Sequence, residues 1–196
     1  MERLNPRTSV LVVVDVQERL AAAMPADAME RLIANAGILL DAARILRVPV
    51  LVSQQYTKGL GPTVAAIAQK LAAGEGGAGE ASDAARVQRI EKLAFDACGE
   101  SKFSQALGAL APRAVVLVGM ETHVCVFQTA RELVRRGYQT HVVIDAVASR
   151  REENRVAGIA LCERAGAVPT VTETVVFDWL ERAGTEEFRQ VSKLVR

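Results

Sequence analysis

Three residues of this sequence, Asp15, Lys92 and Cys125, carry side chains that could together form an activated nucleophile. Each comes at or soon after the end of a segment that could form a strand, where the strand would give way to a loop or helix. A carboxylate can accept the proton of a thiol, and an ammonium group stabilises the thiolate that remains. Cys125 would lie in the first turn of a helix, whose N-terminus also favours negative charge. We therefore expect a lowered pKa for this thiol and nucleophilic chemistry at this site.

Each of these residues also has an ordinary structural interpretation. A lone cysteine in an apolar helix is often a small buried hydrophobic residue. An aspartate after a strand often accepts hydrogen bonds from loop amides, and a lysine there is usually solvated. Cys98 and Cys162 follow no strand, so we assign them to the buried structural class. It is the combination of Asp15, Lys92 and Cys125 that points to catalysis.

The elements that must position these residues are predicted from hydrophobic patterning. Unbroken apolar and β-branched runs predict strands buried on both faces. Such runs cover residues 9–14, 48–53, 114–119, 140–144 and 167–171, and the more polar residues 87–91 (VQRIE) are assigned to a strand as well. Helical patterns separate them, at residues 27–47 and 123–136, after the capping-box pattern Ser149 to Glu152, and near 177–182 and 186–194.

This alternation predicts an α/β fold: a doubly wound, mainly parallel six-stranded sheet with helices on both faces, Rossmann-like in plan. We expect residues 1–196 to form a single domain, because no linker or internal repeat divides them. A long, glycine-rich excursion is predicted after the second strand, where residues 74–79 read GEGGAG. In such sheets ligands bind beyond the carboxyl ends of the strands. That rule selects Asp15, Gln17, Gln54, Gln55, Tyr56, Lys92, residues 119–125 and Asp145.

Composition restricts the partners. Twenty-four basic and twenty-three acidic residues leave a formal net charge of +1, so no field favours nucleic acid or an anionic membrane. No stretch is long enough to span a bilayer. The three scattered cysteines suit a reducing, cytoplasmic compartment. We expect a small-molecule substrate and other copies of the chain as partners.

Four runs of this sequence resemble, in order, the signatures of the isochorismatase-like cysteine hydrolase superfamily. They are residues 13–17 (VVDVQ), 90–95 (IEKLAF), 119–126 (GMETHVCV) and 145–150 (DAVASR). Residues 54–63 (QQYTKGLGPT) further resemble the subgroup called isochorismatase domain-containing proteins.

The resemblance implies a role for each matching residue. Cys125 would be the nucleophile, Asp15 the general base and Lys92 the positive partner of both. A cis peptide bond would join Met120 to Glu121, and the backbone N–H groups of Glu121 and Cys125 would form an oxyanion hole. The chain would then hydrolyse a small amide-like C–N bond through a thioester on Cys125. Gln17, Gln54, Tyr56 and Phe95 would surround the substrate.

Metal and cofactor chemistry is not expected. Nicotinamidases of this superfamily use an aspartate and histidines after the second strand, where this chain has Gln54, Gln55 and Tyr56. Its two histidines have structural interpretations, His141 as a core residue in a strand and His123 as a surface or capping residue. Authentic isochorismatases act on a vinyl ether and need no cysteine nucleophile, so Cys125 argues against that substrate.

Three other classes of protein are alternatives for such a sequence. A dinucleotide or phosphate binder would need a glycine-rich turn after the first strand, where Asp-Val-Gln-Glu-Arg stands instead. A phospho-acceptor domain would need paired acids beside Asp15, where Val16 and Gln17 stand. A non-catalytic or redox-sensing oligomeric relative that binds a small molecule in the same pocket remains open. Ser149 is interpreted as a helix cap and Asp145 as non-catalytic.

Overall fold

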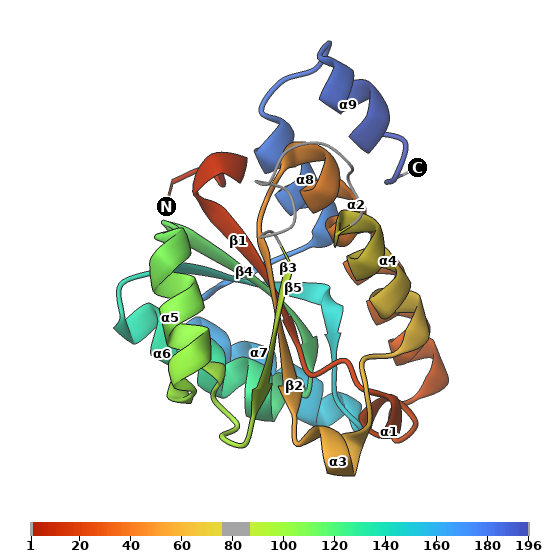
Figure 1. Ribbon diagram of the computed structural model, residues 1–196, viewed down its shortest axis with the longest axis vertical. Helices are drawn as coiled ribbons and strands as arrows, with labels where there is room; N and C mark the ends of the chain where they lie inside the picture. Colours follow the sequence, from red (N-terminus) through yellow and green to blue (C-terminus); the bar gives the residue numbers. More distant parts are fainter. Residues whose placement is uncertain (1, 76–86, 196) are drawn as a thin grey trace.

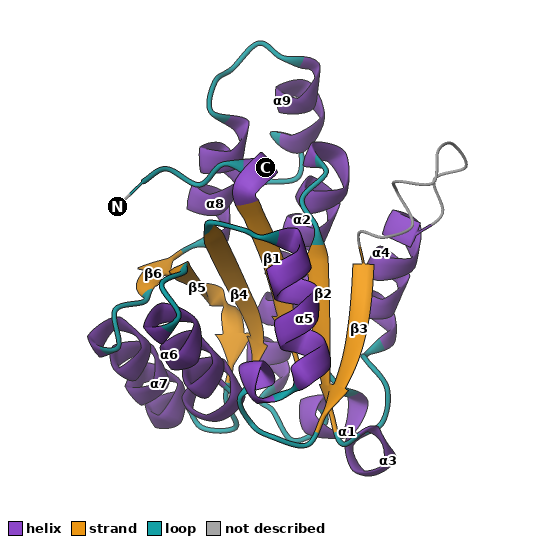
Figure 2. Ribbon diagram, turned by 60° about the vertical axis from the view of Figure 1, so that its left-hand side comes forward, coloured by secondary structure: helices purple, strands orange, loops and turns teal. Residues whose placement is uncertain are grey.

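A parallel sheet of six strands forms the centre of the molecule, and its strand order is β3-β2-β1-β4-β5-β6 (Figures 1 and 2). The computed structural model describes residues 2–75 and 87–195. The strands are β1 (Ser9–Val14), β2 (Val50–Gln55), β3 (Val87–Lys92), β4 (Ala114–Met120), β5 (Gln139–Ala148) and β6 (Val168–Thr170). The predicted doubly wound α/β fold is confirmed. The strand order reverses between β1 and β4, which makes their carboxyl ends the expected ligand site.

Helices cover both faces of the sheet, as Figure 1 shows. One layer holds α2 (Ala26–Leu46), α4 (Ala65–Glu75) and α8 (Thr172–Leu180), and α9 (Glu186–Val191) packs on α2 and α8. The other holds α5 (Ser101–Leu110), α6 (Phe127–Arg135) and α7 (Glu152–Arg164). In β1, Leu11 and Val13 enter the first core, whereas Val10, Val12 and Val14 enter the second. Because both faces are buried, the strand reads as an unbroken apolar run.

Short elements complete the chain. They are η1 (Pro6–Thr8), α1 (Glu18–Ala21), α3 (Thr57–Leu60), η2 (Ala97–Gly99) and the π-helical turn η3 (Thr122–Val126). In Figure 1, α1 and α3 lie at the lower end of the sheet, where β2 ends. This places them beside the carboxyl ends of the strands.

The segment after β2 is more ordered than its glycines suggested. It contains α3 and α4, so the predicted loop-rich excursion is wrong as far as Glu75. Ile67 and Leu71 lie one helical turn apart and are buried in the core that α2 also enters, which explains why this stretch is helical. Residues 76–79 of the glycine-rich run lie outside the described residues.

Strand β5 runs four residues beyond its predicted end at Ile144. Its register with β4 shifts, so that Leu117 pairs with Val142 but Gly119 pairs with Val147. The shift leaves the Asp145 side chain free to accept hydrogen bonds from the N–H and hydroxyl of Thr172 at the start of α8. The interpretation of Asp145 as a non-catalytic residue agrees with this capping contact.

Ser149 does not cap the next helix. The N-cap of α7 is Arg151, which makes no side-chain capping bond, so the predicted capping box is wrong. The Ser149 hydroxyl instead lies 3.1 Å from Nδ1 of His123. It therefore ties the end of β5 to the turn that carries Cys125.

Candidate active site

A buried ion pair joins the ends of β1 and β3. Nζ of Lys92 lies 2.7 Å from Oδ2 of Asp15, and both side chains are almost wholly inaccessible to solvent. Asp15 has φ 50°, a left-handed conformation that aspartate adopts more readily than most residues. Ser53 on β2 donates a hydrogen bond of 2.8 Å to Oδ1 of Asp15. Three neighbouring strands thus position one carboxylate.

The ammonium group of Lys92 is held by further oxygen atoms. It donates to Oε1 of Gln55 at 2.6 Å and to the carbonyls of Ala94 and Phe95 at 3.1 Å each. An ammonium group has three hydrogens, which it shares among these three acceptors and Oδ2 of Asp15. A carboxylate oxygen has two lone pairs, so the contact with Lys92 does not saturate Oδ2 of Asp15. Such an oxygen retains a lone pair that can accept a proton.

Cys125 lies in η3, between β4 and α6, and lines a cavity of about 100 Å³ together with Asp15. Two glycines allow this placement. At Gly119 a Cβ would stand 2.0 Å from the Val14 carbonyl, so only glycine lets β4 approach β1 there. At Gly158 on α7, a Cβ would stand 2.7 Å from the backbone N of His123. The close approach of α7 therefore supports the turn that holds the thiol.

The thiol of Cys125 is protonated at neutral pH. Burial and, to a smaller extent, the Asp15 carboxylate raise its pKa to about 12, while the charge of Lys92 acts in the opposite direction. The expectation of a lowered thiol pKa is wrong for this site, because desolvation outweighs the lysine charge. Burial also raises the pKa of Cys98 and of Cys162 to about 12. What distinguishes Cys125 is its position in the cavity beside a carboxylate and an ammonium group.

The rest of the cavity is mainly apolar. Its walls are formed by Leu20, Leu60, Phe95 and Val124, and Gln55 and Glu121 add polar groups. The Glu121 carboxylate accepts hydrogen bonds from the backbone N–H of Arg150 at 3.0 Å and from its Nε at 3.1 Å. The peptide bond between Met120 and Glu121 is cis.

Of the four residues expected around the substrate, the structure brings only Phe95 to this cavity. Gln17 is buried, and its amide bridges the backbone of Gln55 and the carbonyl of Gly61. Its hydrogen-bonding capacity therefore serves the loops around the site. Gln54 donates to the hydroxyl of Thr63. Tyr56 is half exposed, and its ring occupies the space where a Cβ of Gly59 would lie.

Gln55 is a polar residue in the wall of the cavity, although the prediction of substrate-binding residues named Gln54 instead. Side chains along a strand alternate between its two faces. Leu51 lies in the same core as Cys125, so Ser53 and Gln55 point to the Cys125 side of the sheet. That alternation could have identified Gln55. Leu20, Leu60 and Val124 had no comparable signal, because they reach the cavity from short helices and a turn.

Within residues 2–75 and 87–195 no group of three or more His, Cys, Asp or Glu side chains is arranged to hold a metal ion. His123 contacts Ser149, as described above, and His141 is buried in β5. In the same part of the chain, no helix combines the length and the apolar character needed to cross a membrane.

The fold and this cavity define the class: a doubly wound α/β protein with a cysteine, an aspartate and a lysine at the switch point of its sheet. A family model described as the isochorismatase domain matches residues 9–174. The secreted isochorismatase effector Isc1 of Phytophthora sojae is 36% identical, with 99% of this chain and 87% of that protein covered. Isochorismatase domain-containing protein 2 of Danio rerio is 31% identical, with 98% and 89% covered.

Solved structures agree with this relationship. The MAR1 ribonuclease of Caenorhabditis elegans superposes with a TM-score of 0.85 at 34% identity, covering 99% of this chain and 92% of that one. YcaC of Escherichia coli, described as an octameric hydrolase of unknown specificity, shares the fold at 18% identity and a TM-score of 0.82, with 99% and 91% covered. The chain belongs to the isochorismatase family, and this membership supports a hydrolase activity.

Proposed function

We propose that this protein is a metal-independent cysteine hydrolase that cleaves the C–N bond of a small amide-like substrate. The observation that carries the proposal is the buried ion pair of Asp15 and Lys92, because its carboxylate lines the same cavity as Cys125. A structural thiol would need neither a carboxylate nor an ammonium group beside it.

In the proposed reaction, Sγ of Cys125 attacks the substrate carbonyl carbon while its proton passes to Asp15. The high thiol pKa makes this transfer necessary at the moment of attack, because little thiolate is present beforehand. The oxyanion would accept hydrogen bonds from the N–H groups of Glu121 and Cys125. The C–N bond then breaks, and the amine leaves with the proton that Asp15 had taken. A water molecule, deprotonated by Asp15, hydrolyses the thioester and regenerates the thiol.

Lys92 has two tasks in this scheme. Its ammonium group offsets the buried charge of Asp15 in the resting enzyme, and it offsets the negative charge that develops near Cys125 during attack. Gln55 holds the ammonium in place through Oε1. Gln55 is therefore a positioning residue for Lys92.

The cavity restricts the substrate. About 100 Å³ is below the roughly 300 Å³ at which pockets for drug-sized ligands begin. The apolar walls favour a substrate whose acyl group, the part that stays bound to Cys125 as the thioester, is short and uncharged. The leaving amine would face the open side near Phe95, whose ring is half exposed.

RNA is a poor candidate substrate despite the name of the C. elegans relative. The chain has a formal net charge of only +1, and phosphate contacts by basic side chains dominate nucleic-acid affinity. Cleaving RNA would also place a nucleotide at a cavity of about 100 Å³. We expect no RNA cleavage by purified protein; cleavage that Cys125→Ser abolishes would overturn this assignment.

Assembly and compartment are part of the proposal. The octameric description of E. coli YcaC supports a homo-oligomer here, a dimer or larger, which light scattering on purified protein can test. Three free, buried cysteines suit a reducing compartment such as the cytoplasm. The P. sojae relative is named a secreted effector, so fractionation of the source cells is the required check.

The test is ammonia or amine release from a panel of small amides, ureides and carbamates. We expect turnover of at least one short-chain amide, and losses of roughly three orders of magnitude or more in Cys125→Ser and Asp15→Asn. Cys98→Ser is the matched control, because Cys98 is equally buried but does not line the cavity. Turnover retained in both active-site variants would disprove the mechanism. Absence of turnover across the panel would favour a non-catalytic or redox-sensing binding protein.

A further inference from the structure

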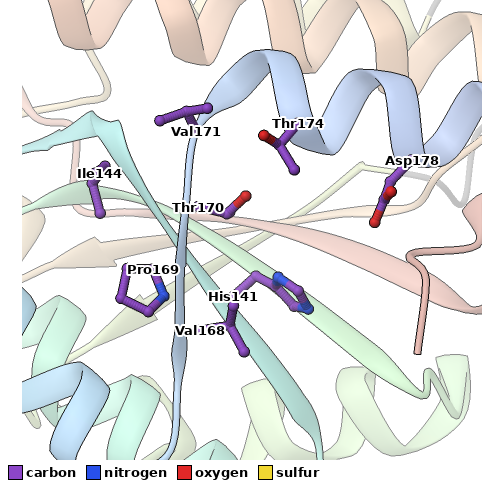
Figure 3. A pocket seen from close by; sticks show the side chains of 8 residues that line it. All are labelled: His141, Ile144, Val168, Pro169, Thr170, Val171, Thr174 and Asp178. Carbon is purple, nitrogen blue, oxygen red and sulfur yellow. The ribbon is translucent and has the colours of Figure 1, made fainter. Parts of the chain in front are cut away.

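A second cavity, of about 330 Å³, lies between the edge strand β6 and helix α8 (Figure 3). None of its lining residues lines the cavity of Cys125. Its volume is at the lower end of the range for small-molecule sites. Its apolar walls come from β5, β6 and the residue before α8, and its polar groups are His141, Thr170, Thr174 and Asp178.

His141 presents an unsatisfied hydrogen-bonding group here. It is 3% exposed, and among the residues that the structure describes its Nδ1 has no hydrogen-bond partner. The amide nitrogen of Gln139 lies 2.6 Å from the Glu2 carbonyl, to which it must donate, and 2.9 Å from Nε2 of His141. The second amide hydrogen therefore points to Nε2, which accepts it. The proton of the neutral imidazole is then on Nδ1.

The neutral form is the one present in this environment. Burial lowers the pKa of His141, and the charge of Asp178 acts in the opposite direction with a smaller effect. A buried N–H donor without an acceptor is unfavourable and rare in folded proteins. A ligand that supplies an acceptor at Nδ1 would remove this penalty.

Asp178 gives the cavity the complementary group. Figure 3 shows its carboxylate and the ring of His141 on the same side of β6. The carboxylate accepts one hydrogen bond, from the backbone N–H of Leu4 at 3.1 Å. A carboxylate has about four acceptor positions, so it can receive a ligand donor as well. The hydroxyls of Thr170 and Thr174 can serve in either role.

We propose that this cavity binds a small uncharged molecule that accepts a hydrogen bond from His141 and donates one to Asp178. A primary carboxamide has this pattern in one planar group, with C=O and NH₂ side by side. The Asp178 carboxylate disfavours an anion, and the N–H of His141 disfavours a cation in contact with it. Val168, Pro169 and Val171 would cover an apolar substituent. The site does not depend on Cys125 or on the hydrolase proposal.

The test uses isobutyramide as the probe and isobutyrate as its control. Backbone amide resonances of β6 and α8 should shift saturably with isobutyramide and remain still with isobutyrate. The same shifts should appear in the full-length Cys125→Ala variant, which separates this site from the catalytic cavity. Absence of saturable shifts at millimolar amide, or equal shifts with both probes, would overturn the proposal.

Two variants test the assigned residues. His141→Phe removes the donor, and Thr174→Met fills the cavity from an exposed position without removing a buried group. Each should weaken isobutyramide binding by about tenfold or more, which corresponds to about 1.4 kcal/mol. Unchanged affinity in Thr174→Met would refute the site even if His141→Phe fails to fold. A change of molar mass in Thr174→Met would show instead that a second copy of the chain covers the cavity, and would likewise refute it.

Discussion

Asp15 and Lys92 are buried so completely that each depends on the other for charge compensation. Lys92→Met should leave the Asp15 carboxylate unpaired and cost about 3–5 kcal/mol of folding stability. The free energy of unfolding in urea measures this cost. Adding Asp15→Asn to Lys92→Met should restore most of it, because the second change removes the stranded charge.

The matched control is Lys70→Met, which breaks the ion pair with Asp41 on the surface between α4 and α2. Lys70 is 43% exposed, so its pair should contribute no more than about 1 kcal/mol. If both lysine variants lose the same stability, burial does not set the strength of the Asp15 and Lys92 pair.

The candidate site could be predicted from sequence only in part, and the residue scale shows why. Asp15, Lys92 and Cys125 come at strand ends, where the topology of a parallel sheet brings side chains together whatever the details. To choose Gln55 over Gln54 as the residue that lines the cavity, one must know to which face of the sheet each side chain of β2 points. Gln17 was predicted to contact the substrate, but its side chain forms hydrogen bonds with the backbone of Gln55 and Gly61. No local sequence pattern encodes these contacts.

At the scale of elements, the packing of α7 against η3 decides where the thiol lies. A Cβ at Gly158 would meet the backbone of Thr122 and His123 at 2.7–2.8 Å. Gly158→Ala should therefore displace η3 and lower the folding stability by about 1–3 kcal/mol. It should also slow turnover by more than this loss of stability explains. Urea unfolding and amide turnover, measured on the same preparation, check both parts.

Gly108→Ala provides the comparison for that variant. Gly108 lies in α5, and a Cβ there would meet no atom of the described part of the chain within 4 Å. Alanine should stabilise this helix by about 0.5–1 kcal/mol and leave turnover unchanged. Equal effects of the two substitutions would contradict a specific role for the α7 contact.

Elements were predictable to the extent that burial was complete. Strands covered on both faces give unbroken apolar runs, so β1 and β4 were found almost to the residue. The helix α4 was missed because glycines follow it closely, although Ile67 and Leu71 already mark its buried face. The extension of β5 followed from a register shift against β4, which depends on the neighbouring strand and not on local sequence.

At the scale of the whole molecule, buried thiols link stability to pH. Burial alone raises the pKa of Cys162 from 9.0 to about 12. As pH rises, the unfolded chain therefore loses the thiol proton before the folded chain does. The stability that the buried, protonated thiol contributes is complete below pH 9 and is lost as pH rises toward 12. The stability difference between the wild type and Cys162→Ala should shrink by about 1.4 kcal/mol between neutral pH and about pH 10. A difference that stays constant over this range would contradict the link.

The central claim is that Cys125 forms a covalent acyl intermediate with the help of Asp15. Brief exposure to p-nitrophenyl acetate, followed by peptide mass mapping, tests it most directly. We expect an acetyl group on Cys125, none on Cys98 or Cys162, and much slower acylation in Asp15→Asn at the same pH. Acylation spread evenly over the three cysteines, or acylation of Cys125 that Asp15→Asn leaves unchanged, would contradict the account.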